Sequence, residues 1–175
     1  SFMPGPVGSM YVSEEVERGL GNVPSAGGEF FTSGTKPPFN SLREWTKSLA
    51  ELPLVAQPGT IWNYSVGMDV MGALIEELSG KPFGEFLEER IFGPLGMEDS
   101  GFTVPDEKID RFAANYGPIP ENMMLMDDPE ISGYRTQPQL ESGGGGLVST
   151  VGDYLKFAQM LLNKGEYEGK RYLGK

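Results

Sequence analysis

Two residue types that often serve catalysis and metal binding are missing from this sequence. Its 175 residues include no cysteine and no histidine. Without cysteine, the chain has no disulfide scaffold, no thiolate nucleophile and no cysteine-ligated zinc site. Without histidine, it has no serine–histidine–aspartate triad and no imidazole base. Any acid–base chemistry must therefore use tyrosine, lysine, aspartate or glutamate side chains.

Positive charge is scarce as well. The chain has 14 Lys+Arg against 25 Asp+Glu, which gives a formal net charge of −11. Repulsion between this charge and a phosphate backbone argues against a nucleic-acid partner. The acidic residues lack the spacing of a calcium loop, and the glycine run at 143–146 lacks the Gly-Lys-Ser/Thr ending of a phosphate loop. We therefore expect no metal and no cofactor.

Long apolar runs are also missing, so we expect no membrane-spanning segment. Residues 1–10 have the character of a vector remnant and are too short and too rich in proline and glycine for a signal peptide, which leaves the compartment open. Residues 11–40 are expected to form an irregular arm, rich in glycine, serine, proline and phenylalanine. The folded domain is expected to cover residues 41–175.

Apolar residues recur at helical spacing in four segments of that domain. We expect helices from Ser41 to Pro53, over 64–78, over 82–91, and from about residue 150. The expected buried residues are Val66, Val70, Ala73 and Leu74 in the second helix, Phe83, Phe86, Leu87 and Ile91 in the third, and Tyr154, Phe157, Ala158, Leu161 and Leu162 in the fourth. The pattern predicts a mainly α fold.

Local signals mark the ends of these helices. Ser41 and Glu44 have the spacing of a capping box. Gly80 is placed to close the second helix in the left-handed conformation. Either Ser149 or Thr150 is expected to cap the fourth helix, because a hydroxyl there can accept a bond from a free backbone N–H.

A small β element is expected between the third and fourth helices. The apolar run Met123–Met126 is bounded by turn residues, which favours a strand, and residues 133–136 are its expected partner. Two interpretations of the run stay open: it lines an apolar acyl pocket, or it belongs to the core.

Three motifs follow one another along the domain. They are Gln57-Pro58-Gly59-Thr60-(x)-Trp62-(x)-Tyr64-Ser65, then Arg90-Ile91-Phe92-(x)-Pro94-Leu95-Gly96-Met97-(x)-Asp99-Ser100, then the run from Glu141 through the four glycines to Asp153-Tyr154. Together they resemble the serine beta-lactamase-like hydrolases, which include class C beta-lactamases, D-alanyl-D-alanine peptidases and family VIII carboxylesterases. The resemblance extends from about Ser41 to Leu173.

The resemblance implies a fold, a reaction and a set of site residues. The fold would be the helical domain of the beta-lactamase/transpeptidase-like α+β fold, with the sheet domain largely absent from this chain. Tyr64 would be the catalytic tyrosine, a phenol whose pKa a neighbouring ammonium lowers, so that it can relay a proton. The residues implied in substrate binding are Trp62, Ser65, Gly144 and Gly145.

The third position of the tyrosine motif departs from the usual pattern of the family. The pattern is usually Tyr-x-Asn, whereas this chain has Val66, as in many of the esterase-like members. The resemblance therefore favours ester over beta-lactam substrates, with acyl transfer through a serine ester.

The nucleophile of the family is not convincingly present. Its Ser-x-x-Lys motif has one match, Ser33-Gly34-Thr35-Lys36. The motif must open a helix so that serine and lysine share a face, and the prolines that follow at 37 and 38 would break it. The Lys/His-Thr/Ser-Gly motif of the family is missing as well. We therefore do not expect Ser33 to be a nucleophile.

Two interpretations of the whole chain remain. In the first, it is the inactive helical portion of a hydrolase whose complete form acts on a small-molecule ester or amide. In the second, it is a standalone, non-catalytic helical binding module descended from that domain. In the first case an apolar face that carries Trp62 and Tyr64 would be uncovered, so we also expect a homo-oligomer.

Overall fold

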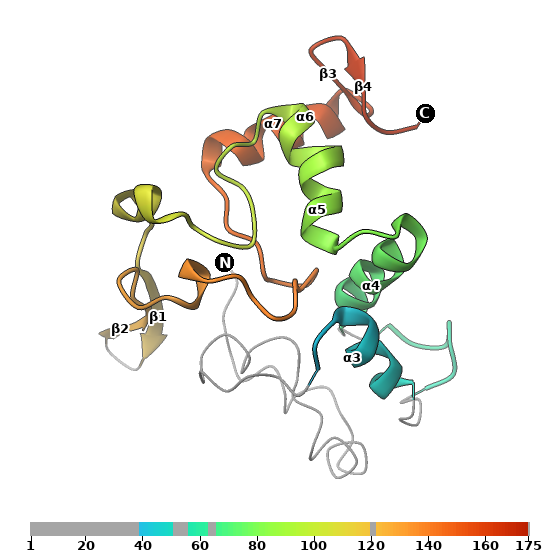
Figure 1. Cartoon of the computed structure of the whole chain (residues 1–175), viewed down its shortest axis with the longest axis horizontal. Coiled ribbons are helices and arrows are strands. Elements are labelled where there is room, and N and C mark those ends of the chain that lie inside the picture. Colours follow the sequence, from blue (N-terminus) through green and yellow to red (C-terminus); the bar gives the residue numbers. More distant parts are fainter. Residues whose placement is uncertain (1–38, 51–55, 63–65, 120–121, 175) are drawn as a thin grey trace.

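The computed structural model describes residues 39–50, 56–62, 66–119 and 122–174, which form helices linked by long loops, with two small sheets of two strands (Figure 1). The helices are α3 (Leu42–Leu49), α4 (Gly67–Ser79), α5 (Phe83–Leu87), the π-helical η1 (Glu88–Phe92), α6 (Gly93–Leu95), the 3-10 turns η2 (Asp106–Arg111) and η3 (Gly133–Arg135), and α7 (Val151–Leu162). The strands are β1 (Asn115–Ile119), β2 (Asn122–Asp127), β3 (Glu166–Tyr167) and β4 (Lys170–Arg171). The described residues thus have the mainly α fold that the sequence predicts.

Helix α3 begins at its predicted cap. The Ser41 hydroxyl accepts a hydrogen bond from the Glu44 backbone N–H at 3.1 Å. The Glu44 carboxylate turns back to accept from the Asn40 N–H at 2.9 Å, one residue earlier than in a standard capping box. The helix ends at Leu49, ahead of the expected stop at Pro53.

Helix α4 begins three residues later than expected and ends as expected. Its first residue is Gly67, and the predicted start at Tyr64 lies outside the described residues. At the other end Gly80 has a φ of 69°, in the left-handed region that lets its N–H bond to the Glu76 carbonyl.

The predicted buried face of α4 is wrong in part: Ala73 is buried as predicted and Val66 packs against the core, but the other two residues are not buried. Val70 and Leu74 are exposed, and the side that faces inward carries Asp69, Gly72 and Ala73. The reason is close packing of helices: a Cβ on Gly72 would come within 3.0 Å of Leu42 on α3. Only small side chains permit this approach, so the small residues of α4, rather than its largest apolar ones, form the contact.

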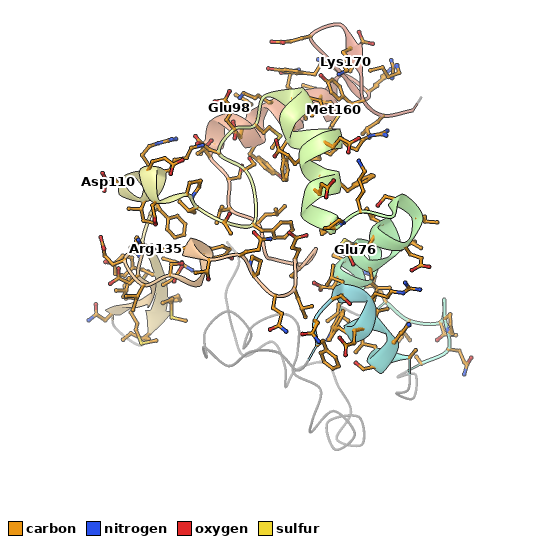
Figure 2. All side chains as sticks on the ribbon, viewed as in Figure 1. Glu76, Glu98, Asp110, Arg135, Met160 and Lys170 are labelled. Atoms are coloured by element: carbon orange, nitrogen blue, oxygen red, sulfur yellow. The ribbon has the colours of Figure 1, made fainter. Side chains whose placement is uncertain are left out.

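The third helical segment is longer than predicted. Helix α5 continues through the π-helical turn η1 into α6, and the chain turns only at Gly96, where φ is 65°. The extension buries Phe92 and Leu95 in one cluster with Met160 of α7, and Met160 is labelled in Figure 2. Phe83 is buried as expected, whereas Phe86, Leu87 and Ile91 are half-buried.

The predicted strand exists, but its predicted partner is wrong. Strand β2 covers Met123–Met126 and pairs antiparallel with β1, with Tyr116 opposite Leu125 and Gly117 opposite Met124. Residues 133–135 instead form the 3-10 turn η3. A hairpin needs only a short loop to bring neighbouring strands together, which favours the nearer partner. All four residues of the apolar run are exposed, so they are not part of the described core.

Helix α7 is capped as predicted, by Thr150, whose hydroxyl accepts from the Asp153 N–H at 3.3 Å. Its predicted apolar face is wrong in part, because Tyr154, Leu161 and Leu162 are exposed. The helix instead turns Asp153 and Met160 inward, at positions that share one side.

Two clusters make up the described core. The first gathers Leu42, Trp45, Ala73, Phe83 and Phe102, and the second Phe92, Leu95, Met97 and Met160. Leu140, in the segment that joins η3 to α7, packs against the first cluster. Among the described residues, no helix combines the length and the apolar character needed to cross a bilayer.

A candidate active-site loop at the start of helix α4

The site residues implied by the resemblance are only partly covered by the structure. Tyr64 and Ser65 lie outside the described residues, as does Ser33. Trp62 is described and is 84% exposed. Gly144 and Gly145 belong to a loop, residues 143–146, that lies against the first turn of α4. We call this segment the glycine loop.

Asp69 binds the glycine loop to α4. Its side chain is 2% exposed and accepts a hydrogen bond from the Ser142 hydroxyl at 2.5 Å. The same carboxylate oxygen is 3.4 Å from the Gly144 backbone N–H, which also donates to Ser142 Oγ at 3.1 Å. Asp69 is the third residue of α4, where the free N–H groups of the helix favour a negative group.

Three of the four glycines are required by close contacts. A Cβ on Gly143 would overlap the Met68 carbonyl oxygen, and one on Gly144 would lie 2.8 Å from Asp69 Oδ2. A Cβ on Gly146 would lie 2.9 Å from the Ser142 carbonyl oxygen. At Gly145 a Cβ would meet nothing within 4 Å. The loop is therefore packed against α4 at Gly143 and Gly144 and against Ser142 and Phe102 at Gly146, while a side chain would have open space at Gly145.

On its other side the loop contacts Tyr134 of η3. The Tyr134 hydroxyl donates to the Gly145 carbonyl oxygen at 3.3 Å. Burial raises the pKa of this phenol, and the nearby charge of Asp127 raises it further, so Tyr134 stays protonated. No sequence signal pointed to Tyr134, because residues 133–136 were expected to form a strand.

A pair of carboxylates fastens the start of the loop to α5. Glu141 accepts from the Gly84 N–H at 2.6 Å, and Glu76 of α4 accepts from the Phe83 N–H at 3.1 Å. Figure 2 shows Glu76 where α4 meets α5. Burial raises the pKa of Glu76, the Phe83 N–H opposes this shift, and the charge of Glu141 adds to it. The two acids complete the first turn of α5 at the cost of mutual repulsion.

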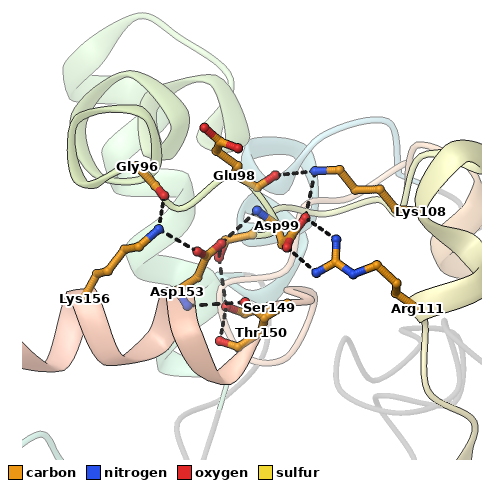
Figure 3. A network of polar contacts seen from close by, with 10 residues as sticks. Gly96, Glu98, Asp99, Lys108, Arg111, Ser149, Thr150, Asp153 and Lys156 are labelled. Carbon is orange, nitrogen blue, oxygen red and sulfur yellow. Dashed lines mark hydrogen bonds and ion pairs between the residues drawn. The ribbon is translucent and has the colours of Figure 1, made fainter.

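A second buried aspartate, Asp153, binds a distant loop a few residues after the glycine loop (Figure 3). Asp153, in the first turn of α7, is 5% exposed. It accepts from the Asp99 N–H at 2.7 Å and from the Ser100 hydroxyl at 3.1 Å. Lys156 lies 3.1 Å from Asp153 and also bonds to the Gly96 carbonyl oxygen.

Asp99 itself is held by two cations. Arg111 contacts it at 2.5 Å and Lys108 at 2.8 Å. The hydrogen bond from Arg111 is the main reason, and the one from Lys108 the second, that the pKa of Asp99 lies well below its usual range. These contacts organise the second sequence motif around α7. They are distant in sequence from the tyrosine motif.

Comparison with known proteins decides the family. The family described as Beta-lactamase matches residues 24–174 of this chain. The chain belongs to that family. The family does not by itself fix the substrate, because the similar proteins have different activities.

Three similar proteins illustrate this range. Protein Rv1367c of Mycobacterium tuberculosis is 40% identical over 74% of this chain and 32% of its own length. Esterase EstB of Burkholderia gladioli is 32% identical over 66% of this chain and 33% of its own. The structure of EstCE1, a hydrolase with promiscuous acyltransferase activity, has a TM-score of 0.62 and 25% identity over 81% of this chain and 40% of that one. The chain thus spans about a third of the curated relatives that it matches.

Replacing Gly143 by alanine should destabilise the protein, whereas replacing Gly145 should not. The new methyl group at Gly143 meets a helix carbonyl that cannot move aside, a kind of overpacking that costs ~1–3 kcal/mol. Gly145→Ala is the matched control, because the space there is open. Urea unfolding of both variants measures the difference. Equal stabilities would contradict the close contact between the loop and α4.

Asp99→Asn should destabilise the protein in a pH-dependent way. The folded pKa of Asp99 is depressed, so its contribution is present above the unfolded value, ~3.9, and is lost as the pH falls toward the folded value. The variant should therefore melt below the wild type at pH 6, and the gap should close on acidification from about pH 4. Thermal melts between pH 6 and 2 test this. A gap that is constant with pH would show that the ion pairs do not contribute.

Proposed function

We propose that this chain is the tyrosine-bearing helical part of a serine esterase of the beta-lactamase family. The observation that carries the proposal is the contact between the glycine loop and the start of α4. The Gln57–Ser65 motif leads into α4, and the glycine loop of the third motif is bonded to the first turn of that helix through Asp69. The glycine loop thus lies at the end of α4 that the tyrosine motif precedes in the sequence.

Tyr64 is the proposed proton relay. A serine hydroxyl needs a base to attack an ester carbonyl, and this chain has no histidine to supply one. A tyrosine whose pKa is lowered by a neighbouring ammonium would accept the proton of the serine and pass it to the leaving alcohol. The serine and lysine would come from the part of the whole protein that lies outside this chain.

The proposed substrates are small-molecule esters. Two observations support esters over beta-lactams: Val66 replaces the usual asparagine of the tyrosine motif, and the similar proteins include an esterase and a hydrolase with acyltransferase activity. Trp62, which is highly exposed, and the open Gly145 are the proposed substrate contacts among the described residues. An acyl group would pass to the serine and then to water or an alcohol.

In the whole protein, Tyr64→Phe should lower kcat for a p-nitrophenyl ester by ~10²–10⁴-fold, because the proton transfer is lost. Tyr154→Phe is the matched control: Tyr154 is an exposed tyrosine on α7 and should change kcat little. The 175-residue chain alone should show no turnover and no labelling by a serine-reactive phosphonate. If Tyr64→Phe retains full activity, the proposed role of Tyr64 is wrong. If the chain alone turns over substrate and Ser33→Ala abolishes this turnover, the prediction that the chain lacks a nucleophile is wrong.

We also propose that the isolated chain self-associates through the outer side of α4. Large apolar residues recur there at helical spacing and are all exposed: Met68, Met71, Leu74 and Leu78. The exposed Ile61 and Trp62 precede the helix. Exposed apolar surface of this kind is unusual on a monomer and gains from being covered by a second copy.

Replacing Leu78 by lysine should weaken this association. Leu78 is 79% exposed, so the substitution removes contact area without disturbing the core. Asn163→Lys, at the exposed end of α7, is the control with the same change of charge. The net charge of −11 opposes association, so added salt should strengthen it in the wild type. Sedimentation at several concentrations measures this. A wild type that stays monomeric at high salt would favour the standalone module instead.

A further inference from the structure

Asp69 is a buried carboxyl group that the proposed reaction does not use. It is almost fully buried, and its partners are the Ser142 hydroxyl and the Gly144 N–H. No lysine or arginine among the described residues pairs with it. Burying such a group is expensive unless its hydrogen bonds are satisfied. An apolar residue at this position would fill the space without that cost.

The cost of burying the Asp69 carboxyl group is offset only when the glycine loop is in the position that supplies its hydrogen-bond donors. The Ser142 hydroxyl bridges, donating to Asp69 and accepting from the Gly144 N–H at 3.1 Å. The Gly143 backbone lies so close to Met68 that no side chain fits between them. If the loop shifted, Asp69 would lose its hydroxyl and amide partners together, and the lost bonds would leave a bare buried carboxyl. Asp69 therefore selects one position of the loop sharply.

We propose that Asp69 is a positioning residue: it fixes the glycine loop against α4 and thereby sets the wall that meets the acyl group of the substrate. This rests on the proposed function, because only then does the loop border an active site. The loop is most open at Gly145, where a Cβ would meet nothing within 4 Å, whereas a Cβ at Gly143, Gly144 or Gly146 would meet protein atoms, so Gly145 is the part left for a ligand.

Asp153 provides a matched comparison within the same chain. It too is a buried aspartate in the first turn of a helix, and it too binds a serine hydroxyl and a backbone N–H of a distant loop. Its loop is the second motif, around Asp99 and Ser100, and not the glycine loop. A general loss of stability should therefore follow from removing either aspartate, whereas an effect on the glycine loop should follow from Asp69 alone.

The first experiment uses the 175-residue chain labelled with 15N. Asp69→Ala should shift the amide signals of Gly144 and Gly146 and raise the rates at which these amides exchange with solvent at least tenfold. Asp153→Ala should move the signals of Asp99 and Ser100 and leave the glycines in place. Asp69→Asn, which keeps an oxygen acceptor for Ser142, should restore most of the wild-type glycine signals. If Asp153→Ala changes the amide signals of Gly144 and Gly146 as much as Asp69→Ala does, the specific link between Asp69 and the glycine loop is wrong.

The second experiment measures specificity in the whole protein with p-nitrophenyl acetate and p-nitrophenyl hexanoate. Asp69→Ala should change the ratio of their kcat/KM values and lower kcat by ~10-fold or more, because an ångström-scale displacement in a site is costly. Asp153→Ala, compared at a temperature where both variants are folded, should leave the ratio unchanged. An unchanged ratio in Asp69→Ala would overturn the positioning role.

The experiments distinguish a failure of the proposed function from a failure of the inference about Asp69. If Tyr64→Phe keeps full activity, the tyrosine mechanism is wrong, but the ratio of the two esters still reports whether the loop that Asp69 holds borders the site. If Asp69→Ala instead behaves like Asp153→Ala in both experiments while Tyr64→Phe is inactive, the esterase assignment stands and the inference about Asp69 falls.

Discussion

The described fold depends on carboxyl groups buried in the first turns of two helices. Asp69 in α4 and Asp153 in α7 each point into the protein, and each binds a loop that is far away in sequence. A buried carboxyl is costly in an apolar interior, but the free N–H groups at a helix start and donors from the loop offset that cost. The loops are held because releasing them would leave those groups without partners. The two hydrophobic clusters complete the described core beside the contacts of Asp69 and Asp153.

This arrangement also explains why sequence periodicity identified the helices but misplaced part of the buried faces of α4 and α7. An amphipathic helix is normally assigned with its apolar stripe inward. In α4 the inward side carries Asp69 and the small residue Gly72, while Leu74 and Leu78 point outward. The buried acid and the close approach of α3 decide the orientation, and neither leaves a periodic apolar signal. Caps are different, because they depend on a few adjacent residues, and so the predictions for Ser41, Gly80 and Thr150 are confirmed.

The candidate site could be predicted in part for the same reason. The resemblance drew attention to the glycine run, and the structure shows that Gly143, Gly144 and Gly146 make close contacts there. Its partners could not be derived, because Asp69 and Ser142 are 73 residues apart and no local pattern links them. The roles of Tyr64 and Ser65 stay predictions, since both lie outside the described residues. The contact of Tyr134 with Gly145 had no usable signal, because its segment resembled a strand.

The three sequence motifs therefore differ in what they do. Residues 142–153 form the link: Ser142 binds α4 at one end, Asp153 binds the second motif at the other, and between them Val148 and Gly101 exchange two backbone hydrogen bonds, at 2.8 and 3.1 Å. The second motif and most of the third thus have structural contacts that account for their residues without any reaction. A reaction needs groups that are accessible to a substrate and are not already engaged in structural contacts. Among the described residues such a group is the open face at Gly145, and the buried Asp69 holds its loop against the first turn of α4.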